Sequence, residues 1–153
     1  MITEVDANLL EFPLDGFMHQ ANCFQTMGSG IALAIKNKYP ELYKADLQLG
    51  HKGNISKLGK FSTVKCHDDK QGYNLYGQYN FGMEKRHTNY ESIYCGMLAI
   101  RNHATENNVI RLGCPRNMGC TLGGGDFRIV RTMIEVIFEN FCGEFYICNY
   151  TPT

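Results

Sequence analysis

Two glycine-rich turns are the parts of this sequence best suited to binding chemistry. The first is segment 27–32, Met-Gly-Ser-Gly-Ile-Ala, and the second is segment 119–127, Gly-Cys-Thr-Leu-Gly-Gly-Gly-Asp-Phe. Each follows a short apolar stretch and precedes a helical pattern, and glycine lets backbone N–H groups come close to an anion. Taken alone, each turn fits ordinary turn formation equally well, because glycine is a common turn residue. Neither is a dinucleotide fingerprint, since Leu33 stands at the third glycine position, and neither is a P-loop, which requires Gly-Lys-Ser/Thr.

Three reactive side chains lie in or near these turns. His19 has a pKa range suited to general acid–base work near neutrality. The alternative is a strand histidine satisfied by a backbone carbonyl, and strand alternation places His19 and Asn22 on opposite faces unless the chain bends between them. Asp126 could act as an acid, but it precedes a helix, where an aspartate is a natural N-cap. Cys120 lies near a helix start that could lower its pKa, although we favour a packing role.

The composition sets the class of protein that these residues belong to. A length of 153 residues predicts one domain, residues 1–153, and the 44% hydrophobic content predicts an ordinary core. A net charge of zero argues against a dedicated nucleic-acid surface. Seven cysteines without a C-x-x-C pair argue against a zinc site or a disulfide framework. No signal peptide or apolar run of about 18 residues is visible. We therefore expect a cytoplasmic protein without a metal, a cofactor or a membrane contact.

Strand and helix patterns alternate along the chain. Strands are expected over 2–10, 17–21, 58–64, 73–79, 109–114 and 144–150, and helices over 31–38, 41–49, 88–105 and from 127 onward. Thr88 and Glu91 have the spacing of a capping box at a helix start. The alternation predicts an α/β domain with a largely parallel sheet covered on both faces. In such folds ligands bind beyond the carboxyl ends of the strands, where both glycine turns are expected.

Several segments in the right order resemble the macrodomain family. Residues 19–23, 27–32, Lys36 and 39–41 resemble its first binding loop, Pro115 with 119–127 resembles its diphosphate loop, and 74–78 with 88–91 resemble its middle segment. The resemblance spans about residues 2–150. It is most similar to the subgroup that contains ADP-ribose 1″-phosphate phosphatases and ADP-ribosyl hydrolases. It implies a three-layer α/β/α macrodomain-like fold with a central mixed, largely parallel sheet.

The resemblance also implies an ADP-ribose pocket. Asn22 would bind the distal ribose, the two loops the phosphates, and Tyr150 the adenine, with Asn8 where the family normally has an Asp. Phe127, which replaces the usual Trp, would support the second loop. The implied ligand-binding residues are Asn8, Asn22, Gly28, Ser29, Gly30, Ile31, Gly119, Thr121, Leu122, Gly123, Gly124, Phe127, Asn149 and Tyr150, and the candidate catalytic residues are His19 and Asn22.

Two departures from the family pattern bear on the reaction. Members that cleave ADP-ribose from carboxylates or bases resemble one another in having a Lys where Gln78 stands, and some carry an Asp where Gly123 stands. Glutamine cannot form a Schiff base or act as a basic nucleophile, so lysine-based chemistry is not expected.

We therefore expect an ADP-ribose-binding protein that hydrolyses ADP-ribose 1″-phosphate, with water aided by His19. One alternative is a reader of free or protein-linked ADP-ribose without catalysis. Another is removal of ADP-ribose from protein or nucleic acid by a lysine-independent route. The expected partners are ADP-ribose or a derivative and ADP-ribosylated macromolecules, without a strong nucleic-acid signal.

Overall fold

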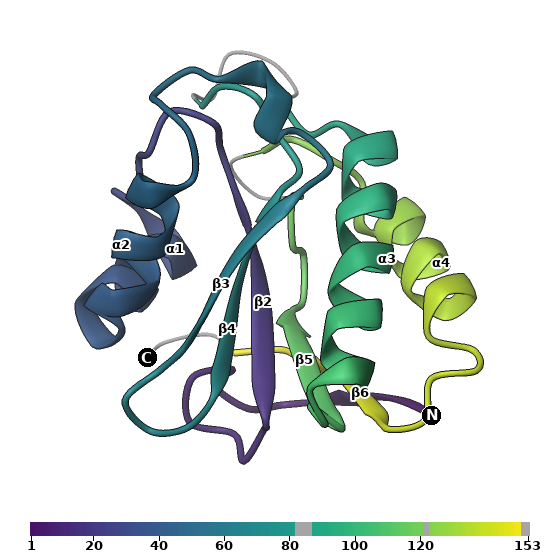
Figure 1. Ribbon diagram of the computed structural model, residues 1–153. Coiled ribbons are helices and arrows are strands. Elements are labelled where there is room, and N and C mark those ends of the chain that lie inside the picture. Colours follow the sequence, from purple (N-terminus) through teal and green to yellow (C-terminus); the bar gives the residue numbers. More distant parts are fainter. Residues whose placement is uncertain (82–86, 121–122, 151–153) are drawn as a thin grey trace.

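Six strands form one mixed sheet in the computed structural model, which describes residues 1–81, 87–120 and 123–150 (Figure 1). The strand order is β1-β6-β5-β2-β4-β3. All neighbouring strands run parallel except β3, which pairs antiparallel with β4. The strands are β1 (Ile2–Val5), β2 (Gly16–Ala21), β3 (Phe61–Lys65), β4 (Gln71–Tyr76), β5 (Arg111–Pro115) and β6 (Glu144–Cys148).

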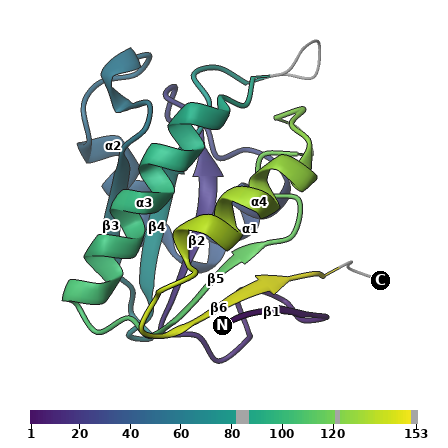
Figure 2. The same ribbon diagram turned by 90° about the vertical axis from the view of Figure 1, so that its right-hand side faces the viewer.

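Four α-helices cover the two faces of this sheet. They are α1 (Gly30–Lys38), α2 (Pro40–Gln48), α3 (Tyr90–Glu106) and α4 (Phe127–Ile137), with a short 3-10 turn η1 (Ile55–Lys57). Figures 1 and 2 show α1 and α2 on one face and α3 and α4 on the other. The expected three-layer α/β/α arrangement with a largely parallel sheet is confirmed.

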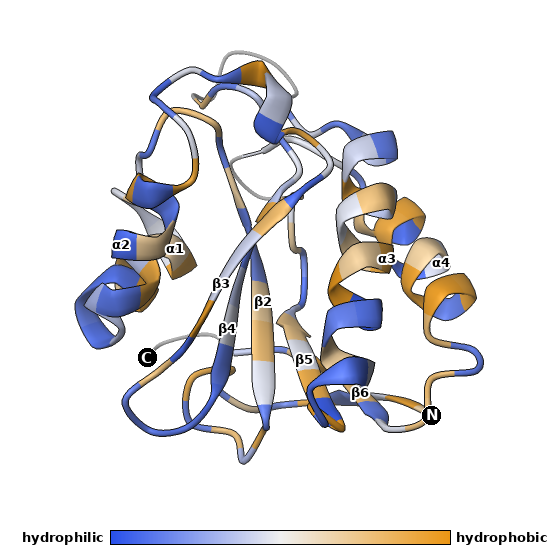
Figure 3. Cartoon of the chain, viewed as in Figure 1, coloured by the Kyte–Doolittle hydropathy of each residue, from blue (hydrophilic) through white to orange (hydrophobic). Residues whose placement is uncertain are grey.

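Alternating strand residues supply a separate core to each face, as the period of two along a strand requires. On the α3–α4 side, Met18 of β2 packs in a cluster with Ile100 and Ile134. On the α1–α2 side, its neighbour Phe17 packs with Ile35 and Leu42. Figure 3 shows the apolar residues along the strands and on α4 between these layers. None of the described helices is long and apolar enough to cross a membrane.

The helix starts differ from the sequence prediction at one point. Helix α3 is capped by Asn89, whose side chain accepts a hydrogen bond from the Ser92 N–H at 3.0 Å. The predicted Thr88–Glu91 capping box is therefore wrong, because Thr88 is buried and its hydroxyl donates to the Gly119 carbonyl instead, at 2.5 Å. Helix α4 is capped by Asp126, which accepts from the Arg128 N–H at 3.0 Å, so the N-cap reading of this residue is confirmed.

Strands β1, β4 and β6 end earlier than predicted, and the loops that follow them line the carboxyl edge of the sheet. Strand β1 stops at Val5 rather than Leu10, because residues after it form a turn in which Asn8 Oδ1 accepts from the Leu10 N–H at 3.0 Å. Strand β6 stops at Cys148. The loops that leave β2, β4, β5 and β6 all emerge at the carboxyl edge of the parallel strands, the usual ligand position in open α/β sheets.

Candidate ligand-binding cleft

A cleft of about 970 Å³ lies along this carboxyl edge. That volume is at the upper end of the range for small-molecule sites. Its described lining comes from five loops that are distant in the sequence. The lining residues are Asn8, Leu9, Gln20, Ala21, Asn22, Thr26, Met27, Gly28, Ser29, Gly30, Ile31, Ala32, Gln78, Phe81, Pro115, Arg116, Asn117, Met118, Gly119, Gly123, Cys148, Asn149 and Tyr150.

The first glycine turn presents the N-terminus of α1 to the cleft. Ser29 is the N-cap residue, but its side chain makes no capping hydrogen bond, and the first turn of α1 contains no acidic residue. The first intrahelical bond at this end runs from the Leu33 N–H to the Ser29 carbonyl, at 3.2 Å. The preceding N–H groups have no acceptor within the helix, and the helix dipole favours negative charge beside them. This end of the cleft is therefore suited to a phosphate.

Asn22 joins strand β2 to this turn. Its Oδ1 accepts hydrogen bonds from the N–H groups of Phe24 (2.9 Å) and Thr26 (3.4 Å), and its Nδ2 donates to the Thr26 carbonyl (3.0 Å). Both polar ends of the side chain are thus used to fold the 22–26 loop. Asn22 lines the cleft, and its hydrogen bonds shape the wall.

The second glycine turn is folded back on itself and against α3. The Gly125 N–H donates to the Gly119 carbonyl at 2.9 Å, and the N–H groups of His87 and Thr88 donate to the Gly123 carbonyl at 2.9 and 3.0 Å. A Cβ on Gly123 would overlap Thr88 Oγ1, so only glycine fits there. Gly119 and Gly123 line the cleft, whereas Gly124 is exposed and lies outside its lining. Thr121 and Leu122 lie outside the described residues.

A relay of side-chain amides connects the two sides of the cleft floor. Gln20 Nε2 donates to Gln78 Oε1 at 2.6 Å and to Thr88 Oγ1 at 2.9 Å. Thr88 Oγ1 in turn donates to the Gly119 carbonyl, and Gln78 Nε2 donates to the Asn80 carbonyl at 2.6 Å. In this network Gln20 donates to Gln78, and Gln78 donates onward to Asn80. The hydrogen bond from Gln20 therefore fixes the orientation of the Gln78 amide. Sequence reasoning missed Gln20 and Thr88, although strand alternation from His19 could have indicated Gln20.

Asn8, Asn149 and Tyr150 line one end of the cleft together. The Asn149 N–H donates to the Val5 carbonyl at 2.8 Å, which ties the end of β6 to the end of β1. Asn149 Nδ2 donates to Asp6 Oδ1 at 3.3 Å. Tyr150 is 54% exposed and can stack on a planar ring. Phe81 is similarly exposed in the cleft lining, with its ring 6.3 Å from that of Phe24.

The structure does not bring His19 to the cleft. Its side chain is fully buried, and Nε2 lies 2.6 Å from Asn74 Oδ1 on the α1–α2 side of the sheet. Burial lowers the pKa of this imidazole, an effect that the hydrogen bond to Asn74 opposes only in part. A buried group without access to the cleft cannot reach a bound substrate, so the geometry gives the expected catalytic role of His19 no support.

The other candidate reactive groups are also outside the cleft or unreactive. Burial raises the pKa of the Cys120 thiol to about 11, which opposes the activation that its position near a helix start suggested. Cys148 does line the cleft, but burial likewise raises its pKa to about 11. Phe127 is buried in the core on the α3–α4 side, beneath the second loop and not in the cleft lining.

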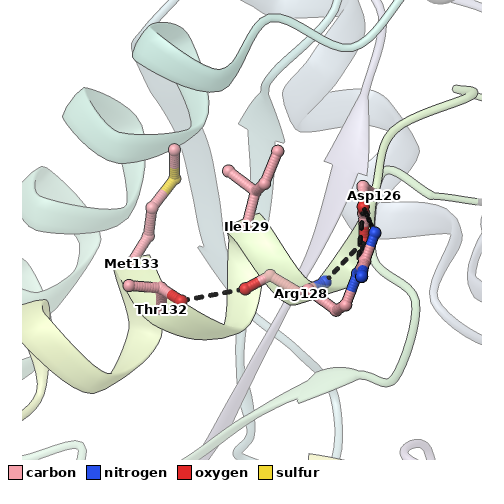
Figure 4. A pocket seen from close by; sticks show the side chains of 5 residues that line it. All are labelled: Asp126, Arg128, Ile129, Thr132 and Met133. Carbon is pink, nitrogen blue, oxygen red and sulfur yellow. Dashed lines mark hydrogen bonds and ion pairs between the residues drawn. The ribbon is translucent and has the colours of Figure 1, made fainter.

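Asp126 borders a different, shallow depression on α4, which Figure 4 shows with its five lining residues. Asp126 Oδ2 accepts from Arg128 Nη2 at 2.7 Å, and Thr132 Oγ1 donates to the Arg128 carbonyl at 2.9 Å. The hydrogen bond from Arg128 lowers the pKa of Asp126. The Arg128 side chain is 91% exposed, so this depression is open solvent-facing surface rather than a binding site.

Electrically, the main cleft is almost neutral. Arg116 is the only charged side chain in its described lining, while six lining residues carry amides. Within residues 1–81, 87–120 and 123–150, no group of three or more His, Cys, Asp or Glu side chains is placed to hold a metal ion. The cleft therefore offers hydrogen-bond donors and acceptors, but among described residues it offers no imidazole, carboxylate or ammonium group for proton transfer.

Comparison with solved structures identifies the class of fold. The chain superposes on the macrodomain of Mycobacterium tuberculosis DarG with a TM-score of 0.83, at 24% identity and over 100% of this chain and 99% of that one. It also superposes on a structure of Thermosipho africanus DarTG in complex with ADP-ribose, with a TM-score of 0.79 and 17% identity. This superposition covers 97% of this chain and 41% of that one. The fold is that of a macrodomain.

Sequence comparison adds a family assignment. The chain is 30% identical over 139 residues to a 17.5 kDa protein of Enterobacteria phage T4 from the tk-vs intergenic region, covering 88% of this chain and 85% of that protein. The chain belongs to the same family as this phage protein. It is also 34% identical over 64 residues to a DNA ADP-ribosyl glycohydrolase of Mycobacterium tuberculosis, which covers 42% of this chain and 18% of that enzyme. No family model matches the sequence.

Proposed function

We propose that this macrodomain binds ADP-ribose, or a close derivative, in the cleft at the carboxyl edge of the sheet. One observation supports this most directly. A helix N-terminus without a side-chain cap and a second glycine turn line the same cleft, together with several amide side chains and the exposed ring of Tyr150. A diphosphate needs the first two features, and a ribose and an adenine need the last two.

The proposed orientation follows from the same features. The diphosphate lies between Gly28–Ile31 on one side and Gly119 and Gly123 on the other. The distal ribose lies towards Asn22 and Gln78, and the adenine lies against Tyr150. Asn8 and Asn149 offer neutral amide groups to the adenine edge, so this end selects by hydrogen bonding rather than by charge.

Calorimetric titration with ADP-ribose, AMP and NAD tests the proposal. ADP-ribose should bind more tightly than AMP, because AMP lacks the second phosphate and the distal ribose. Tyr150→Ala should weaken ADP-ribose binding by about 1–3 kcal/mol, or about five- to 150-fold, through loss of stacking. Tyr94→Ala is the matched control, because Tyr94 is a part-exposed tyrosine on α3 that does not line the cleft. Absence of ADP-ribose binding would overturn the proposal.

Hydrolysis of ADP-ribose 1″-phosphate is the second candidate function. It is favoured by the free N–H groups at the start of α1, which suit a phosphate near Asn22. Since the described lining holds no imidazole, carboxylate or ammonium group, water and the substrate phosphate itself would have to supply the proton transfers. A phosphate-release assay tests this activity, with His19→Gln as the variant that should leave turnover unchanged in the folded protein. If phosphate release is no faster than with a denatured sample, hydrolysis is excluded and ADP-ribose binding is the remaining function.

Release of ADP-ribose from a macromolecule is the third candidate, and the partial likeness to a DNA ADP-ribosyl glycohydrolase supports it. Gln78 stands where that chemistry would need a lysine, so the reaction would require another route. Assays on ADP-ribosylated DNA and on ADP-ribosylated protein distinguish the two substrates. Lack of release from both would remove this candidate without affecting the binding proposal.

A further inference from the structure

Arg116 is the single charged side chain in the described lining of an otherwise neutral cleft. It follows β5 and is held from outside the cleft by Glu4 of the edge strand β1. Glu4 Oε1 accepts from Arg116 Nε at 2.8 Å, while Glu4 Oε2 accepts from Nη2 of Arg131, on α4, at 2.6 Å. One carboxylate therefore serves two guanidinium groups, and Arg131 also pairs with Glu135 at 3.8 Å.

The way in which Glu4 holds Arg116 leaves the far end of the guanidinium available. Only Nε of Arg116 is used in the contact with Glu4. Its Nη1 and Nη2 groups donate to no acceptor in the described parts of the chain. Two adjacent N–H donors on one planar cation match the oxygen spacing of a phosphate monoester. The contact with Glu4 thus orients Arg116 without satisfying its remaining donors.

Strand pairing fixes where along the cleft this cation lies. Pro115 of β5 is paired with Cys148 of β6, and the Arg116 N–H donates to the Cys148 carbonyl at 2.8 Å. Arg116 is therefore next to the end of β6, from which Asn149 and Tyr150 enter the cleft; β1 and β6 lie side by side there (Figure 2). In the proposed orientation, this is the adenosine end.

The diphosphate of the ligand already has its own donors, which are the start of α1 and the second glycine turn. A cation at the adenosine end is thus available for a further negative group. We propose that Arg116 forms a second anion subsite that accepts a phosphate on the 2′-hydroxyl of the adenosine ribose. The preferred ligand is then ADP-ribose 2′-phosphate, the species left when a 2′-phosphorylated dinucleotide loses its nicotinamide. This inference rests on the proposed binding of ADP-ribose.

The neighbouring charged groups are compatible with such a subsite. An arginine beside the adenosine ribose is the usual way in which proteins accommodate a 2′-phosphate. Glu4, the acidic group in contact with Arg116, is engaged by two arginines, which lower its pKa and keep it ionised. Asp6 is the opposing group on this side, but it is exposed, hydrogen-bonded to Asn149 and outside the cleft lining.

The experiment compares the affinities of the intact protein for ADP-ribose and ADP-ribose 2′-phosphate by calorimetry at low ionic strength. The expected result is binding of the 2′-phosphate about five- to tenfold tighter, since the guanidinium is partly exposed and its charge is screened. In Arg116→Gln the ratio of the two dissociation constants should fall to about one. Raising the salt concentration should reduce the ratio in the wild type.

Arg131→Gln is the matched control. Arg131 shares Glu4 with Arg116 but does not line the cleft, so this variant should keep the preference. Equal binding of the two ligands by the wild type would overturn the subsite, as would a preference that persists in Arg116→Gln or that disappears equally in Arg131→Gln. Failure to bind either ligand would instead overturn the proposed function, so the two failures are distinguishable.

Discussion

His19 and Gln20 are neighbours in β2, yet they enter two polar networks of opposite character. His19 points to the α1–α2 side and into a network that is buried from solvent. Gln20 points to the other side and into the amide relay on the floor of the cleft. A difference of one position in a strand therefore separates a buried network from one that lines the cleft.

The buried network contains the ionisable groups. From His19 it runs through Asn74 to Ser62 (3.0 Å), to Tyr76 (2.8 Å) and on to Asp46 (2.6 Å). It ends in an ion pair between Asp46 and Lys57, at 3.2 Å, whose side chains are 1% and 2% exposed. Such groups are costly to bury, and hydrogen bonds among them offset that cost, although His19 Nδ1 and Asp46 Oδ2 have no partner among the described residues.

The cleft network is made of neutral groups. Its amides donate and accept hydrogen bonds without changing charge near neutral pH. A titratable side chain that is adjacent in sequence to cleft residues therefore need not line the cleft itself. In this protein the histidine lies in a buried network, and the glutamine next to it faces the cleft. Four variants test this division, beginning with the largest expected effect.

Breaking the buried ion pair should destabilise the protein most. Lys57→Met removes the partner of a buried carboxylate and should lower the free energy of unfolding by about 3–5 kcal/mol. Urea denaturation followed by circular dichroism measures the change. Lys52→Met, at an exposed lysine in the same connection, is the control and should alter stability by less than about 0.5 kcal/mol. Similar losses in both variants would contradict the assignment of the network.

Breaking the amide relay should affect both stability and binding. Thr88→Val removes the hydroxyl that joins Gln20 to the Gly119 carbonyl and should cost about 1–3 kcal/mol of stability. ADP-ribose affinity, measured by calorimetry on the folded variant, should also fall, because the second glycine turn loses its anchor. Thr132→Val removes a comparable hydroxyl on the exposed face of α4 and should leave affinity unchanged. Unaltered affinity in Thr88→Val would show that the relay does not support the site.

The buried histidine predicts a specific dependence of stability on pH. Because burial lowers its pKa below the ordinary 6.5, the unfolded chain binds the proton more readily than the folded one. Stability from this group is fully present above pH 6.5 and is lost as the pH falls through the folded-state pKa, by at most about 1.4 kcal/mol per pH unit. Denaturation curves in His19→Gln should show a flatter dependence below pH 6.5 than the wild type. His51→Gln, at an exposed loop histidine, should keep the wild-type slope.

The neutral cleft predicts the smallest effect, which is on binding. ADP-ribose affinity of the wild type should change by less than about twofold between pH 6 and 8, since the described lining contains no imidazole or carboxylate. Gln78→His places an imidazole in the cleft and should make binding tighten as the pH falls. Calorimetry at both pH values measures the two proteins. A pH-dependent wild type would show that an ionisable group contributes to binding after all.

The same division explains how far the sequence could be interpreted. The order of strands and helices followed from hydrophobic periodicity, and the helix cap at Asp126 followed from a local rule about residues before helices. The capping box at Thr88 was wrong because its hydroxyl is taken by Gly119, which is 31 positions away. A local rule cannot foresee a partner that another part of the fold supplies.

By itself, the sequence determined the α/β class, the parallel sheet and the two glycine turns, because these depend on residue type and on short-range spacing. Only the tertiary structure decided that His19 is buried, that Gln20 faces the cleft, and that Arg116 is held there by Glu4 across 112 positions. Those placements depend on strand order and register. Both are fixed by packing between distant segments. The alternation of side chains along a strand does not by itself indicate which face of the sheet borders the cleft.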